Sequence, residues 1–336
     1  MSEPTARQIE ADNFFAVQQL YLENGWTDGL PIIPPTPGLV EQALSFTKLD
    51  PGDVIGRVPE RRRTITVEKV AINAVMAGCR PEYLPVVLAG VDAFSTPESN
   101  PHGPTASTGG SALMLIVNGP PVRQLGFNSG GNAFGPGPGA HANATVGRAL
   151  RLVLLNCAGS VPGQADRSTL GHAGKFSWCI AEDESDERWH PLHVVRGFEP
   201  AQGAVTTFWG LSTLQVSDHV SAAPEDILAS FAAQFHRPGM PRGSGCQVVV
   251  VVGGEHRATL AGAGLSKEDV RDGLYRLRPD DTISEPEDIL VVSAGGTGGR
   301  FSALSFSWGS GHRYLAATRT VEACVNLSET NVRGSD

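Results

Sequence analysis

The chain has 336 residues and a formal net charge of −9, and its 40% hydrophobic and 18% charged content allows a large buried core. The negative charge argues against a nucleic-acid-binding protein, and no apolar run approaches the roughly 20 residues of a membrane span. Five widely spaced cysteines without a Cys-x-x-Cys pair are typical of reduced thiols, so we expect a cytoplasmic protein.

The first third of the chain is expected to be mainly helical. An apolar stripe predicts an amphipathic helix within the first 25 or so residues, and a proline-rich extended arm follows over Asp28–Pro37. Thr36 and Pro37 are typical of a helix start, and this helix runs to about Phe46. Capping and proline signals predict two more helices, over residues 66–78 and 81–94.

From residue 112 the pattern changes to strands, glycine-rich loops and helices. The predicted strands cover residues 112–118, 175–181, 203–210, 246–252 and 288–293. Helices are predicted from Asn143 or Thr145, from Pro224, after the Gly253-Gly254-Glu255 turn, and over residues 267–277, where Ser266 begins a capping box.

Two segments share a seven-residue pattern. Gly171–Ser177 and Gly296–Ser302 both read G-x-x-G-[K/R]-F-S, and each follows a Pro-Glu helix start and a buried strand in the same order. Chance is the alternative because glycine is abundant, but three anchors in one order favour an internal duplication. We therefore predict an α/β fold of two similar α-β-α-β halves, with a parallel or mixed sheet and a pseudo-twofold axis.

The predicted boundaries follow this scheme. Residues 1–63 hold the N-terminal helix, the proline-rich arm and the next helix, and residues 64–195 form the first α/β half. Residues 196–316 form the second half, and residues 317–336 are a C-terminal tail.

The duplication predicts a ligand site between the halves, where the two shared segments face each other. Lys175 and Arg300 are expected to bind an anionic group of a small substrate, together with amides of the neighbouring glycines. The other predicted substrate-binding residues are Ser177, Ser302, Asn128, Asn132, Gly298 and Gly299. A tight turn without a ligand is the open alternative for the glycine run, and a left-handed turn is the alternative for Asn128.

Residues next to the shared segments supply candidate catalytic groups, namely His172, Cys179, Glu182, Asp218 and His219. The histidines are suited to proton transfer, and Lys175 is close enough in sequence to lower the pKa of the Cys179 thiol. A small buried hydrophobe is the alternative role for Cys179. His172, His219 and Asp218, with Glu182, also combine the ligand types of a divalent metal, although their spacing matches no metal motif.

Five segments carry a family resemblance: TDGLPIIPPT (Thr27–Thr36), TVEKVAINAVMAGCRPEYLPVVLAGV (Thr66–Val91), NSGGNAFGPG (Asn128–Gly137), ANATVGRALRL (Ala142–Leu152) and GHAGKFSWCIAEDE (Gly171–Glu184). Through them the chain resembles the bacterial domain found beside, or fused to, the UGSC (seleno)protein module, named for a Sec/Cys-Gly-Ser-Cys motif. Besides the candidates above, the resemblance puts weight on Glu68, Lys69, Asn73, Cys79 and Asn143.

The UGSC module itself is similar to thiol- or selenol-bearing subunits of reductases that cleave bonds between carbon and a heteroatom. This chain lacks the motif, because Gly243-Ser244-Gly245-Cys246 does not match it. The resemblance therefore implies that a redox-active thiol pair, if the chemistry is redox, comes from another polypeptide.

Three functions agree with these patterns. The first is an enzyme of lyase or reductase type that makes or breaks a carbon–sulfur or carbon–nitrogen bond in a small anionic metabolite, with no cofactor identified. The second is a hydrolase with a divalent metal on His172, His219, Asp218 and Glu182. The third is a non-catalytic partner that presents substrate to a separate thiol or selenol redox protein. The apolar Ile32 and Ile33 also make a homo-oligomer a candidate assembly.

Overall fold

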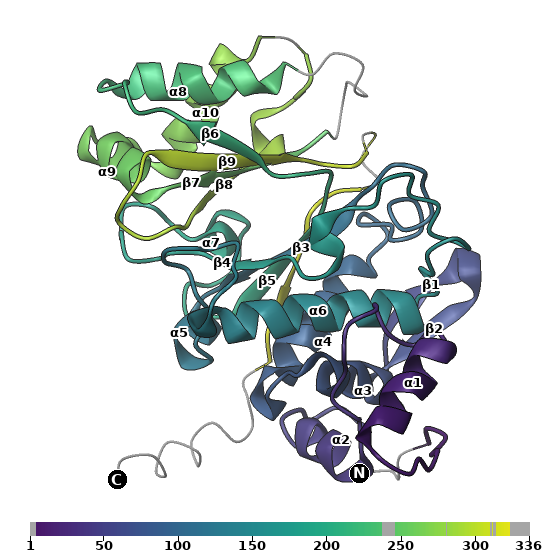
Figure 1. Ribbon diagram of the computed structural model, residues 1–336. Helices are drawn as coiled ribbons and strands as arrows, with labels where there is room; N and C mark the ends of the chain where they lie inside the picture. Colours follow the sequence, from purple (N-terminus) through teal and green to yellow (C-terminus); the bar gives the residue numbers. More distant parts are fainter. Residues whose placement is uncertain (1–4, 237–245, 280, 310, 312–313, 323–336) are drawn as a thin grey trace, which may run out of the picture.

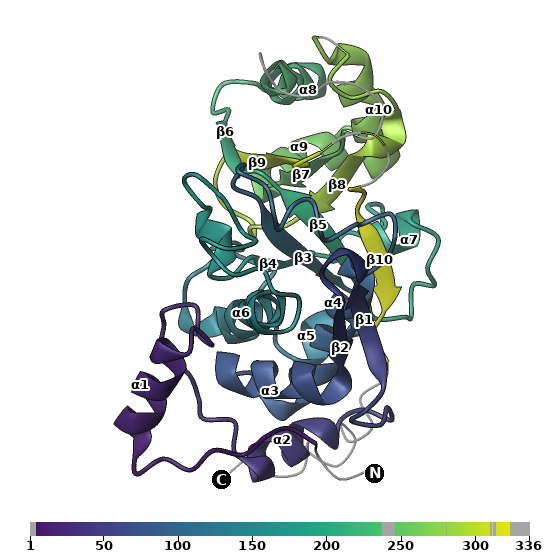
Figure 2. The same cartoon turned by 90° about the vertical axis from the view of Figure 1, so that its right-hand side faces the viewer.

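Two four-stranded sheets lie face to face, and helices cover the outer face of each, so the fold has four layers (Figures 1 and 2). The computed structural model describes residues 5–236, 246–279, 281–309, 311 and 314–322. The predicted mixed α/β class is confirmed.

The first sheet has the strand order β10-β5-β3-β4. Its strands are β3 (Ala112–Asn118), β4 (Cys179–Ala181), β5 (Ala204–Gly210) and β10 (Ala317–Thr320). β3 is parallel to β4, with Leu115 opposite Cys179, and antiparallel to β5. All seven residues of β3 are buried, as expected for a strand covered on both faces.

The helices over the first sheet come mainly from the N-terminal part of the chain. They are α2 (Pro37–Leu44), α3 (Val67–Ala77), α4 (Leu84–Phe94), α5 (Pro120–Gln124) and α6 (His141–Asn156). A hairpin of β1 (Val54–Val58) and β2 (Arg63–Thr66), which the sequence pattern did not predict, precedes α3. The amphipathic helix α1 (Phe14–Glu23) forms where it was predicted, but none of its residues is buried.

The second sheet has the strand order β6-β9-β7-β8. Its strands are β6 (Leu214–Ser217), β7 (Val248–Val252), β8 (Ile289–Ser293) and β9 (Phe301–Phe306). Its outer helices are α8 (Pro224–Ala232), α9 (Gly254–Gly262) and α10 (Lys267–Leu277), and the short α7 (Leu192–Val195) precedes β5. The capping box predicted at Ser266 is present, because Ser266 and Asp269 exchange hydrogen bonds.

Successive side chains of each strand point to opposite faces of the sheet, and this alternation divides the buried residues into three hydrophobic cores. On β7, Val248 and Val250 pack under the outer helices, whereas Val249 and Val251 face the first sheet. On β3, Met114 and Ile116 face the second sheet. The layer between the sheets is therefore apolar, and it buries strand side chains on the inner faces of both sheets.

The structure does not show an internal duplication, although three strands of each sheet share order and direction, as β4-β3-β5 and β8-β7-β9. The seven-residue match falls at non-equivalent places. Gly171–Ser177 leads into β4, which is parallel to β3, whereas Gly296–Ser302 leads into β9, which is antiparallel to β7. The matching segments therefore do not align the two sheets.

The predicted boundaries at residues 196 and 317 do not separate the sheets. β5 lies in the predicted second half and β10 in the predicted tail, yet both belong to the first sheet. After the second sheet the chain therefore returns to the first sheet, where β10 pairs antiparallel with β5. The remainder of the predicted tail, residues 323–336 with Cys324, lies outside the described residues.

Candidate functional site: a cavity between the sheets

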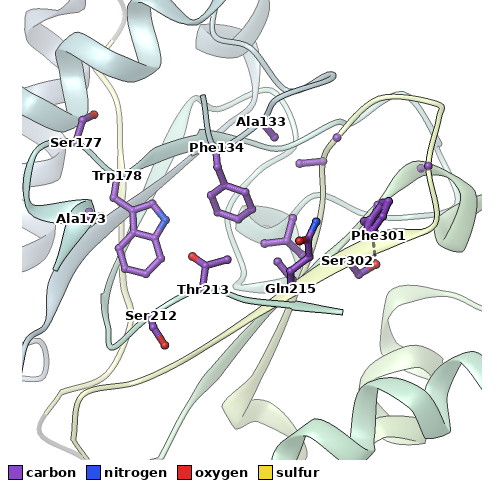
Figure 3. Close-up of a pocket in the computed structure, with 18 of the residues that line it drawn as sticks. Ala133, Phe134, Ala173, Ser177, Trp178, Ser212, Thr213, Gln215, Phe301 and Ser302 are labelled. Atoms are coloured by element: carbon purple, nitrogen blue, oxygen red, sulfur yellow. Dashed lines mark hydrogen bonds between the residues drawn. The ribbon is translucent and has the colours of Figure 1, made fainter. Parts of the chain in front are cut away.

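A cavity of about 780 Å³ lies between the two sheets (Figure 3). The shared segments contribute His172, Gly174 and Ser177 from one side and Gly298, Gly299, Phe301 and Ser302 from the other. The structure therefore brings the two segments to one site, as the sequence analysis expected. The volume is within the range of small-molecule sites in proteins.

The two cations of the shared segments do not line this cavity. Lys175 Nζ lies 2.7 Å from Asp166 Oδ2, on the far side of its own turn. Arg300 Nε lies 3.5 Å from Glu255 Oε2, and its Nη1 donates to the carbonyl of Ser221 at 2.5 Å. The expectation that both cations face each other across a bound anion is therefore not met, because each has a nearer partner in the protein.

Glycines let the second sheet approach its own loop closely at the cavity wall. A Cβ on Gly254 would lie 1.9 Å from the carbonyl oxygen of Gly296, and Gly299 has a φ of +91°, which favours glycine. Gly253 and Gly254 form the start of α9 directly after β7. A helix start leaves amide donors without an intrahelical acceptor, so this wall is suited to a negatively charged or oxyanionic group.

Ser302 is the cavity residue with an ionisable partner behind it. Its hydroxyl lies 2.8 Å from Nδ1 of the fully buried His256 and accepts a hydrogen bond from the Gly253 amide at 3.1 Å. The other imidazole nitrogen, Nε2, lies 3.1 Å from the backbone oxygen of Asp218. A carbonyl only accepts, so Nε2 carries the proton and Nδ1 accepts from Ser302. Burial lowers the pKa of His256, which keeps the imidazole neutral.

His172 and three aromatic side chains shape the rest of the cavity. The His172 ring stacks on Trp178 with a centroid distance of 4.9 Å, and its Nδ1 accepts the Gly174 amide proton at 2.8 Å. Burial and nearby Lys175 lower the pKa of His172. Figure 3 shows Phe134 beside Trp178, with Phe301 on the opposite wall. These rings give the cavity an apolar lining suited to a ligand with a hydrophobic part.

Glu182 lies outside the cavity and holds the layers together. It is 1% exposed, forms an ion pair with Lys267 of α10, and accepts the amide protons of Asn118 at 2.6 Å and Ser293 at 3.1 Å. Next to it, Asp183 lies 2.9 Å from Arg257. We call the four charged residues Glu182, Asp183, Arg257 and Lys267 the interlayer seam. Glu182, predicted as a catalytic residue, therefore does not line the cavity and instead joins the two layers.

Asp218 and His219 are not brought together with His172. The Asp218 carboxylate accepts the amide protons of Val220 and Ser221. Burial by itself would raise the pKa of this carboxyl, but the hydrogen bonds outweigh it and lower the pKa to about 2. His219 is exposed and packs edge-on against Phe301. Within the described residues no group of three or more His, Cys, Asp or Glu side chains is arranged to hold a metal ion.

Cys179 is a buried core residue, which was the alternative named for it. Burial raises the pKa of the Cys179 thiol, and it raises that of Cys79 to about 12. Ser177 lines the cavity, but its hydroxyl donates to the Ala144 carbonyl at 2.8 Å. Lys175 therefore does not activate a thiol, and neither cysteine is a ready thiolate nucleophile at neutral pH.

The two predicted asparagines stabilise a loop. Asn128 accepts from the Gly130 amide and donates to the Gly131 carbonyl, and Asn132 has a φ of +55°. Asn143, which the family resemblance singled out, holds the Asn128 backbone through two hydrogen bonds of 2.8 and 3.0 Å. This loop brings Phe134 to the cavity, so the asparagines position a wall.

Several cavity residues were not predicted, chiefly Phe134, Trp178, Thr213 and Gln215, nor was His256, which lies behind Ser302. One signal was present, because a strand that ends in Gly-Gly directly before a helix is a common ligand-binding arrangement. The pairing of Ser302 with His256, 46 residues apart, has no such local signal.

The fold and this cavity define a four-layer α/β protein with a cavity of small-molecule size between its two sheets. Comparisons with protein-family models, curated proteins and solved structures found no match. Among the described residues, no helix is both long and apolar enough to cross a membrane.

Proposed function

We propose that the chain is a cytoplasmic enzyme that acts on a small anionic metabolite bound between the sheets. The bond that it breaks joins a carbonyl carbon to sulfur or nitrogen. The observation that supports this most is the Ser302 hydroxyl, which lines the cavity and lies 2.8 Å from a neutral, buried imidazole. A hydroxyl becomes an effective nucleophile when an adjacent base takes its proton.

In this reaction the Ser302 oxygen attacks the carbonyl carbon, and its proton passes to His256 Nδ1. The carbon–sulfur or carbon–nitrogen bond then breaks, and the leaving atom takes that proton from Nδ1. Water hydrolyses the resulting ester and restores the hydroxyl. Amides at the start of α9, around Gly254, are suited to stabilise the oxyanion, and the Asp218 carbonyl keeps His256 in the required tautomer.

The test needs no knowledge of the natural substrate. We expect a fluorophosphonate probe to label Ser302, detected by mass spectrometry of the intact protein and its peptides. Ser302→Ala should abolish labelling, and His256→Gln should slow it at least ~100-fold, because the base is lost. Ser177→Ala is the matched control: its hydroxyl lines the same cavity but is bonded to a carbonyl, so labelling should persist. Absence of labelling, or equal rates in wild type and His256→Gln, overturns the proposal.

A second candidate is a substrate-presenting partner of a separate thiol or selenol redox protein, as the resemblance to the UGSC-associated domain implies. The burial of Cys79 and Cys179, which raises both thiol pKa values, favours it, because the reactive thiol then lies on another polypeptide. Ligand binding without turnover, with product released only when a UGSC protein is added, would support this candidate. Turnover by the purified chain alone contradicts it.

The common strand order of the two sheets also leads us to propose that they descend from one duplicated unit. The equivalence that supports this is β4-β3-β5 with β8-β7-β9. A structure-based alignment of homologous sequences tests it, because a duplication predicts detectable similarity between β3 and β7 and their flanking helices.

A further inference from the structure

A second hollow lies on the other side of the 171–175 turn. It has a volume of about 590 Å³, and its walls include Asp28, Arg151, His172, Lys175 and Phe176. We call it the Lys175 groove. His172 lines both the groove and the inter-sheet cavity, so one turn of chain separates the two sites.

Arg151 is the unusual residue of this groove. It is 9% exposed, and its nearest ionic neighbour, Asp166 Oδ2, lies 3.9 Å from Nη2, which is too far for a hydrogen bond. No other acceptor among the described residues bonds to its guanidinium. A buried guanidinium has five N–H donors and is stable only when acceptors or an opposite charge compensate its desolvation.

The carboxylates near Arg151 are each held more closely by another cation. Asp28 is held bidentately by Arg148, at 2.8 and 2.9 Å. Asp166 is held by Lys175 Nζ at 2.7 Å. Among the described residues, the three cations Arg148, Arg151 and Lys175 therefore share two carboxylates, and the only ion pair of Arg151 is the 3.9 Å contact with Asp166, which Lys175 binds more closely.

We propose that the Lys175 groove binds an oxyanion, a carboxylate or a phosphate group, on the guanidinium of Arg151 and the ammonium of Lys175. The guanidinium fork matches two oxygens of such a group, and Lys175 supplies a point charge. Lys175 thus keeps the anion-binding role expected from sequence, but with Arg151 in place of Arg300. The proposal does not depend on the reaction at Ser302.

The test is thermal unfolding of the full chain with sodium acetate or inorganic phosphate, at constant ionic strength maintained with chloride. Wild type should show a saturable rise in melting temperature, because ligand binding stabilises the folded state. Arg151→Met should weaken the fitted affinity at least tenfold. Arg188→Gln, an exposed arginine paired with Asp186, is the matched control and should leave it unchanged.

A second variant keeps the proposal testable if Arg151→Met does not fold. Asp166→Asn removes the carboxylate that competes for Lys175, so the affinity for the anion should rise at least tenfold. Saturation by acetate alone assigns a carboxylate ligand, and saturation by phosphate alone assigns a phosphate. No saturable shift in wild type, an equal shift in Arg151→Met, or an unchanged affinity in Asp166→Asn overturns the proposal.

Discussion

The interlayer seam and the inter-sheet cavity are neighbours along the same strands, yet they use opposite chemistry. β4 connects Trp178 of the cavity to Glu182 of the seam, and β8 ends at Ser293, whose amide donates to Glu182, directly before Ala294 of the cavity. In the seam each charge has a partner. The cavity wall consists of glycine backbone, aromatic and small aliphatic side chains and uncharged polar side chains, with His172 as the one titratable side chain among the described lining residues.

This difference explains why charged residues near a glycine-rich turn misled the sequence interpretation. Between two packed layers a charge is tolerated when an opposite charge and hydrogen bonds satisfy it. Glu182 therefore marks where the layers are joined, and the adjacent glycines mark where they separate around a cavity.

The largest effect is expected in the seam. Glu182→Ala leaves Lys267 buried without a counter-charge, and it should lower the free energy of unfolding by about 3–5 kcal/mol, measured by denaturant titration. The matched control is Asp186→Ala, which breaks an exposed pair with Arg188 and should change it by less than about 1 kcal/mol. The double variant Glu182→Gln, Lys267→Met removes both charges and should therefore lose much less free energy of unfolding than Glu182→Ala. A loss below about 1 kcal/mol for Glu182→Ala would show that the seam does not join the layers.

A smaller effect is expected at the cavity wall. Gly254→Ala places a Cβ 1.9 Å from the Gly296 oxygen, so backbone must move. We expect a loss of about 1–3 kcal/mol, with slower fluorophosphonate labelling of Ser302. Gly262→Ala, in the same helix with nothing within 4 Å of the new Cβ, should stabilise by about 0.4–1 kcal/mol and leave labelling unchanged. Equal labelling rates in both variants would show that the start of α9 does not contribute to the reactivity of Ser302.

The smallest effect is expected in the pH dependence of fluorophosphonate labelling at Ser302. Only neutral His256 accepts the Ser302 proton, so labelling should fall as the pH drops through the pKa of His256. Burial places that pKa below the ordinary value of about 6.5. Labelling rates measured between pH 5 and 8 should therefore be half-maximal below pH 6.5. A midpoint above pH 7 would mean that another group controls Ser302.

Local patterns predicted much of the secondary structure because their causes are local. The buried strands at residues 112–118 and 248–252 are continuous apolar runs, and α10 begins where the Ser266 capping box places it. The β1–β2 hairpin, β6, β9 and β10 were missed, and the strand predicted over residues 175–181 forms only at Cys179–Ala181, because Ala173–Lys175 is a 3-10 turn. β10 was read as tail because its partner, β5, lies more than 100 residues earlier in the chain.

The sequence by itself determined the α/β class, most helices and strands, and the glycine-rich segments that line one cavity. Only the tertiary structure decided which side chains face that cavity. It turned Lys175 toward Asp166 and Arg300 toward Glu255, buried Glu182 and Cys179, and placed His256 behind Ser302. The physical reason is that backbone propensity acts over a few residues, whereas charge pairing and burial depend on residues that are distant in sequence and meet only in the folded chain.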